Sequence, residues 1–135
     1  KSFSPFVPKF NYGFYEKNEV KNPSLGILIE SQKGIDNAEI LLKNSNVDFI
    51  YFGAYDFSVE ISKQGDIFCK EILDNLNYLI SIAKKYNKKI MSLYRNKKEL
   101  ETLIKMKIDF PISSVDTSHF MQKLKKESFT YKGLN

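Results

Sequence analysis

From residue 25 onward, apolar positions follow two alternating patterns. Short and nearly continuous apolar runs, typical of β-strands, cover residues 25–30, 47–53, 89–94 and 110–116. After each run, apolar residues recur at the spacing of an amphipathic helix, over residues 34–44, 69–87, 97–107 and 118–126. Near-continuous apolar strands are typical of parallel sheets that are covered on both faces. The pattern predicts an α/β fold built from four successive βα units.

Residues 1–24 do not share this pattern. Pro5, Pro8 and Pro23 interrupt any periodicity and predict an extended lead-in loop. We therefore divide the chain into this lead-in, a four-unit segment at residues 25–126 and a C-terminal tail at residues 127–135. Because the sequence starts at Lys1 rather than at a methionine, we expect it to be a piece of a longer protein.

Composition narrows the class of protein. A chain of 135 residues with 42% hydrophobic residues can form one domain with its own core. The lone cysteine, Cys69, excludes an internal disulfide and predicts a small buried residue in a reducing, cytoplasmic compartment. Apolar runs are far shorter than the roughly 18 residues of a membrane span, so we expect no membrane association. The net charge of +5 comes from dispersed lysines with one arginine, Arg95, which argues against a nucleic-acid partner.

Two acidic residues follow neighbouring strands of the predicted sheet. Glu30 ends the run LGILIE, and Asp56 follows the next strand in GAYDFS. In parallel α/β proteins, reactive groups gather at the C-terminal ends of the strands. Adjacent strands lie about 4.8 Å apart, so two carboxylates there can share one hard cation with water and substrate oxygens. The alternative interpretation is that Glu30 caps a helix and Asp56 belongs to a turn.

The stretch IESQKGIDNAEILLKNSNVDFIYFGAYDFS resembles the HpcH/HpaI aldolase/citrate lyase family. The matching residues are Ile29, Glu30, Asn37, Val47, Asp48, Gly53, Asp56 and Ser58. The resemblance continues through Gly65 and AKKYNKKI to the last strand, FPISSVD, and so covers about residues 25–125. It implies a TIM (β/α)8 barrel, of which this chain holds about the last four βα units.

The resemblance also implies an activity. Members of this family act as 2-oxo acid (pyruvate-type) aldolases or lyases, which form or cleave carbon–carbon bonds through a metal-stabilised enolate. This chain would be the metal-binding portion, with Glu30 and Asp56 as ligands of a divalent metal such as Mg²⁺, Mn²⁺ or Co²⁺. The substrate would be a small 2-oxo acid such as pyruvate or oxaloacetate.

Further site residues are implied by the same resemblance. Gly53, Ala54 and Tyr55 would bind the substrate carboxylate through backbone N–H groups, which form a short polar cradle for anions. Ser31 and Ser58 would orient the two acids.

The chain departs from the family pattern in several places. Ala54 and Phe57 stand where the family has proline and leucine in the motif around Asp56. The family's catalytic histidine and substrate-binding arginine come from the first half of the barrel, so no catalytic residue is assigned here. We interpret Arg95 and His119 as surface or packing residues.

Two alternatives stay open. A degenerate, non-catalytic relative would keep the barrel scaffold without the activity. A flavodoxin-like or response-regulator-like domain also carries acidic residues at strand ends, but it would need an acidic pair near the first strand.

Four βα units leave a sheet with two free edges, which we expect to be covered by a missing N-terminal half or by a second copy in a homo-oligomer.

Overall fold

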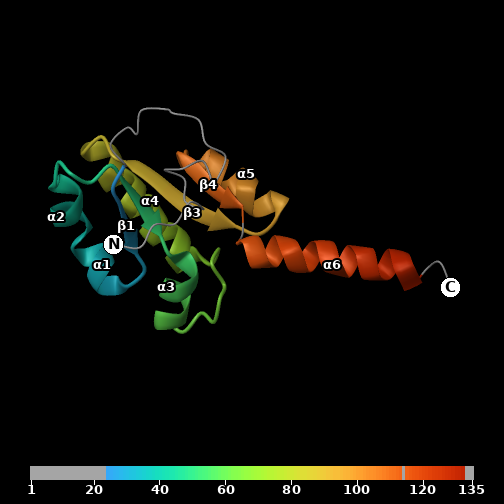
Figure 1. The fold of residues 1–135 in the computed structure, drawn as a ribbon. Helices are drawn as coiled ribbons and strands as arrows, with labels where there is room; N and C mark the ends of the chain where they lie inside the picture. The colour runs from blue at the N-terminus through green and yellow to red at the C-terminus, as the bar shows by residue number, and fades with distance from the viewer. Residues whose placement is uncertain (1–23, 114, 133–135) are drawn as a thin grey trace, which may run out of the picture.

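The computed structural model of the protein describes residues 24–113 and 115–132. The strands β1 (Gly26–Ile29), β2 (Phe49–Phe52), β3 (Lys89–Tyr94) and β4 (Phe110–Ser113) form a parallel sheet in the order β1-β2-β3-β4 (Figure 1). This arrangement confirms the predicted α/β fold and its succession of parallel strands. The predicted lead-in lies almost wholly outside the described residues.

The helices differ from the predicted ones in three places, two of them before β3. The helices α1 (Gln32–Asp36) and α2 (Ala38–Lys43) replace the single helix predicted at residues 34–44. Between them, the side chain of Asn37 donates a hydrogen bond to Lys33 O at 2.7 Å and competes with regular helix geometry. Helix α3 (Ala54–Glu60) lies between the predicted strand at residues 47–53 and the predicted helix at residues 69–87, where no helix was predicted. Helices α4 (Lys70–Lys85) and α5 (Lys97–Lys105) match the predicted segments.

The last helix, α6 (Asp116–Lys132), extends beyond both ends of the predicted segment at residues 118–126. It runs into residues 127–135, which we expected to form a tail. Figure 1 shows that it projects away from the sheet and the other helices. Its apolar residues Phe120, Met121 and Leu124 are exposed. No helix among the described residues is long and apolar enough to cross a membrane.

The core lies on one face of the sheet. Ile29, Ile50, Phe52 and Ile90 point to this face and are buried. They pack in one cluster with buried helical side chains, which include Ile35, Leu42, Phe57, Ile72, Leu76, Leu79 and Leu103. Burial of one such side chain stabilises the fold by about 1.5–3 kcal/mol.

The other face of the sheet carries apolar side chains that are not buried. Leu28, Tyr51, Met91 and Phe110 stand in register across the strands, and Phe49 lies in the row below. We call these residues the open face. Leu28 is 51% exposed and Phe110 is 48% exposed. Within the described part of the chain, β1 and β4 each have one edge without a neighbouring strand, as expected for part of a barrel.

Candidate functional site

Glu30 follows β1 directly and lies beside Gly53, the residue that follows β2. Since Leu28 and Tyr51 are register partners, Glu30 and Gly53 occupy the next row on the same face of the sheet. A Cβ atom added to Gly53 would lie 2.7 Å from Glu30 Cβ and 3.3 Å from Glu30 Oε2. Glycine at this position therefore makes room for the Glu30 carboxylate next to the start of α3.

Asp56 lies in the first turn of α3, whose N-cap residue is Gly53. Burial raises the pKa of Tyr51, and the negative charge of Asp56 raises it further. Tyr51 belongs to the open face, and Asp56 follows the same strand within the first turn of α3. Sequence reasoning missed Tyr51, although the alternation of side chains along FIYF places it on the same face as Gly53.

Glu30 and Asp56 are both exposed to solvent. Neither forms a hydrogen bond or an ion pair with another described residue. The cap of α1 is Ser31 rather than Glu30, so Glu30 does not serve as the capping acid of the alternative interpretation. Two free carboxylates completed by water and substrate oxygens suit a hard divalent cation. No group of three or more His, Cys, Asp or Glu residues that could hold a metal occurs in the described ranges.

The start of α3 is also the predicted carboxylate cradle. The N–H group of Gly53 donates to Ile29 O at 2.8 Å and is therefore occupied. Ala54 and Tyr55 are the first helical residues, whose N–H groups have no partner within a helix. The proposed cradle therefore has fewer N–H donors than the sequence implies. Gly53 provides space for the neighbouring carboxylate but no free N–H group.

The two serines that we expected to orient the acids bond to backbone atoms instead. Ser31 Oγ accepts a hydrogen bond from Gly34 N at 3.2 Å and caps α1. Ser58 is fully buried; its Oγ donates to Tyr55 O at 2.6 Å and accepts from Gly65 N at 2.9 Å. Each serine bonds to the backbone near one of the two acids. That the serines orient Glu30 and Asp56 stays a prediction, and they would do so through the main chain.

Comparison with known proteins shows the family of this chain. The sequence matches the HpcH/HpaI aldolase/citrate lyase family over residues 9–122. The chain belongs to this family. It is 31% identical over 68 residues to a 5-keto-4-deoxy-D-glucarate aldolase of Klebsiella pneumoniae, across 50% of this chain and 27% of that relative.

Solved structures of the HpcH/HpaI family share the fold. An HpcH/HpaI aldolase from Desulfitobacterium hafniense superposes with a TM-score of 0.72 at 15% identity, over 81% of this chain and 42% of that one. A family protein from Burkholderia cenocepacia superposes with a TM-score of 0.73 at 14% identity, over 98% of this chain and 52% of that one. The chain therefore spans about half the length of these structures, or less, and corresponds to part of an HpcH/HpaI barrel.

The loop after α3 connects the HpcH/HpaI motif to the rest of the domain. Ser62, Gln64 and Gly65 adopt positive φ angles of 59°, 47° and 86°. A Cβ added to Gly65 would lie 3.0 Å from the ring of Tyr55, so the loop folds back onto α3. Lys63 Nζ lies 2.5 Å from Glu71 Oε1 at the start of α4, and this contact lowers the pKa of Glu71 to about 2.

Arg95 and His119, which we expected to be surface or packing residues, both have partners in the described part of the chain. Arg95 follows β3 and pairs with Glu99, with 2.6 Å between Arg95 Nη2 and Glu99 Oε1. His119 is exposed on α6, and its Nε2 lies 2.8 Å from Ser113 O. Both positions agree with the expected surface or packing roles.

Proposed function

We propose that this chain provides the metal-binding part of a 2-oxo acid aldolase or lyase, in which Glu30 and Asp56 hold Mg²⁺, Mn²⁺ or Co²⁺. The observation that carries the proposal is that two exposed carboxylates, neither hydrogen-bonded nor ion-paired to another described residue, follow the C-terminal ends of the neighbouring strands β1 and β2. A bound divalent cation would polarise the keto group and offset the negative charge of an enolate. The name of the Klebsiella relative, an aldolase, supports this type of reaction.

The backbone at the start of α3 would recognise the substrate carboxylate. The N–H groups of Ala54 and Tyr55 point out of the helix start, where the helix dipole favours an anion. Burial and the charge of Asp56 raise the pKa of Tyr51, so its phenol is protonated at neutral pH, as an ordinary tyrosine is. Tyr51 can thus donate a hydrogen bond to a substrate oxygen, but it is not a base. These features suit a small 2-oxo acid such as pyruvate or oxaloacetate.

The proposed reaction also needs a proton acceptor and benefits from a cation that binds the substrate. In the proposed site, Glu30 and Asp56 are occupied by the metal, and the Arg95 guanidinium is already paired with Glu99. The base and the substrate-binding cation would then come from other βα units, in a missing N-terminal half or in a second copy of the chain. We therefore expect no useful rate of aldol cleavage from these 135 residues alone.

The release of pyruvate from a 4-hydroxy-2-oxo acid, measured with added Mg²⁺ or Mn²⁺, tests this proposal. We expect no turnover by the isolated chain and recovery of activity when a separately expressed N-terminal half of the barrel is added. Turnover by a monomeric preparation of the isolated chain would contradict the assignment of base and cation to other units.

The second candidate is a non-catalytic family member that keeps the scaffold. The observation that favours it is the pair of departures at Ala54 and Phe57 in the motif around Asp56. Such a protein would stay inactive after the two halves are combined, even if the reunited barrel binds Mn²⁺ and pyruvate. The same assay therefore separates the two candidates.

A further inference from the structure

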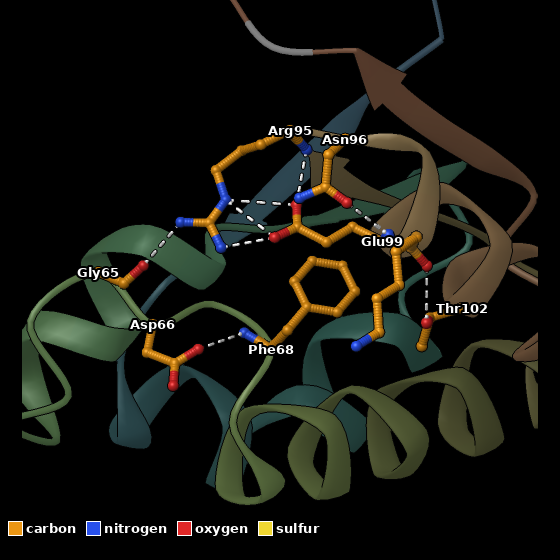
Figure 2. A network of polar contacts seen from close by, with 8 residues as sticks. Gly65, Asp66, Phe68, Arg95, Asn96, Glu99 and Thr102 are labelled. Carbon is orange, nitrogen blue, oxygen red and sulfur yellow. Dashed lines mark hydrogen bonds and ion pairs between the residues drawn. The ribbon is translucent and has the colours of Figure 1, made fainter.

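Glu99 is a buried residue, 8% exposed, and its carboxylate is bound to Arg95. Glu99 Oε2 accepts from the backbone N–H of Arg95 at 2.7 Å, and Glu99 Oε1 accepts from Arg95 Nε and Nη2 at 3.1 and 2.6 Å (Figure 2). At the same helix start, Asn96 Oδ1 accepts from Glu99 N at 3.0 Å. The Glu99 carboxylate therefore holds both the backbone N–H group and the guanidinium of Arg95.

The third guanidinium nitrogen of Arg95, Nη1, bonds to the loop after α3. Arg95 Nη1 donates to Gly65 O at 3.1 Å, a contact between residues that are far apart in the sequence (Figure 2). Gly65 N in turn donates to Ser58 Oγ, and Ser58 Oγ donates to Tyr55 O. Asp56 lies between Tyr55 and Ser58 on this short helix. A continuous set of hydrogen bonds thus joins the end of β3 to the turn that carries Asp56.

We propose that Arg95 and Glu99 are positioning residues that fix residues 54–68 against the end of β3 and so set the position of Asp56. This inference rests on the proposed metal-binding function. A planar guanidinium held by a buried carboxylate is a rigid donor, whereas a lone surface arginine would keep its rotamer freedom. The loop needs such a restraint, because Ser62 and Gln64 hold positive φ angles that residues with a side chain rarely adopt.

Two measurements on the same variants test this arrangement. Amide hydrogen exchange in residues 54–68 reports the restraint without any metal, and the Kd for Mn²⁺ reports its effect on the site. We expect Arg95→Ala to speed exchange in this segment and to weaken Mn²⁺ binding by about 10-fold, the lower end of the usual loss when a group that orients a metal ligand is removed. Glu99→Gln keeps the shape of the side chain and should show the same effects more weakly. Lys97→Ala is the matched control, because Lys97 makes an exposed i,i+4 contact with Glu101 at 4.0 Å on the same helix.

A double variant separates positioning from general destabilisation. Arg95 and Ser58 act through the same residue, Gly65, so Arg95→Ala combined with Ser58→Ala should weaken Mn²⁺ binding less than the product of the two single effects. Unchanged exchange in residues 54–68, or independent effects of the two substitutions on the Kd, would overturn the inference. Mn²⁺ binding that is insensitive to Asp56→Asn would instead refute the proposed function, and the exchange data would still decide whether the restraint exists.

Discussion

Gly53 is the residue on which the geometry of the proposed metal site depends most directly. Any larger side chain at this position meets Glu30, since an added Cβ would lie 2.7 Å from Glu30 Cβ. The sequence predicted Gly53 as part of the motif, but not that its small size makes room for the neighbouring carboxylate. This role depends on the register between β1 and β2, which a single sequence does not specify.

Gly53→Ala should weaken Mn²⁺ binding and lower the free energy of unfolding by about 1–3 kcal/mol, the usual cost of overpacking. Gly26→Ala is a matched control at the other end of β1, where an added Cβ would overlap the ring of Phe49. It should destabilise the fold without affecting the Kd for Mn²⁺. Titration with Mn²⁺ and urea denaturation of both variants check this prediction. Normal Mn²⁺ affinity in Gly53→Ala would contradict it.

The Glu99 carboxylate should make stability depend on pH. Burial raises the pKa of Glu99, but the hydrogen bonds from Arg95 outweigh burial and hold the pKa below its usual value of 4.5. A carboxylate whose pKa is lowered by folding stabilises the protein above its unfolded-state pKa, and this contribution is lost as the pH falls through the folded-state pKa. Its loss therefore begins below about pH 4.5.

Urea denaturation between pH 7 and pH 3 measures this effect. The difference in unfolding free energy between the unmodified protein and Glu99→Gln should be largest at neutral pH and shrink below about pH 4.5. Glu101→Gln on the same helix provides the control, because Glu101 makes only a long contact with Lys97. A difference that stays constant over the whole pH range would show that the Glu99 charge does not contribute.

At the scale of elements, the strands were more predictable than the loops that position the site. The apolar runs located all four strands, and strand order followed from successive βα units. Helix α3 was missed because it has only seven residues and follows the strand without a polar cap. The contact between Arg95 and Gly65 was also missed, because it depends on two loop conformations that local sequence does not determine.

Ser58 links α3 to the loop that follows it. In Ser58→Ala, the half-buried Gly65 loses the acceptor of its N–H group, which should lower the free energy of unfolding by about 1–3 kcal/mol. Ser81→Ala is a close control, since Ser81 Oγ donates to Tyr78 O at 2.6 Å in the same local pattern but is exposed. It should change stability by less than about 0.5 kcal/mol. Equal effects of the two substitutions in urea denaturation would contradict the proposed importance of the link to Gly65.

At the scale of the whole molecule, the open face exposes apolar side chains, and the edge strands β1 and β4 each have one edge without a neighbouring strand in the described residues. Leu28 and Phe110 are about half exposed on a face that a closed barrel would bury. Exposed apolar patches and unpaired strand edges both favour association. We therefore expect the isolated chain to self-associate as its concentration rises.

Leu28→Lys combined with Phe110→Lys should shift the chain towards the monomer in sedimentation experiments. Ile40→Lys is the control, because Ile40 is 73% exposed but lies on α2 rather than on the open face. A chain that stays monomeric at high concentration would argue against association through this face. Equal loss of association in Ile40→Lys would show that the added charge, rather than the open face, is responsible.

The central claim is that Glu30 and Asp56 together form a divalent-metal site, and calorimetric titration with Mn²⁺ tests it most directly. We expect saturable binding by the unmodified chain and its loss in both Glu30→Gln and Asp56→Asn. Asp74→Asn, which removes an exposed carboxylate from α4, should leave binding unchanged. Mn²⁺ binding of equal affinity in all four proteins would contradict the claim.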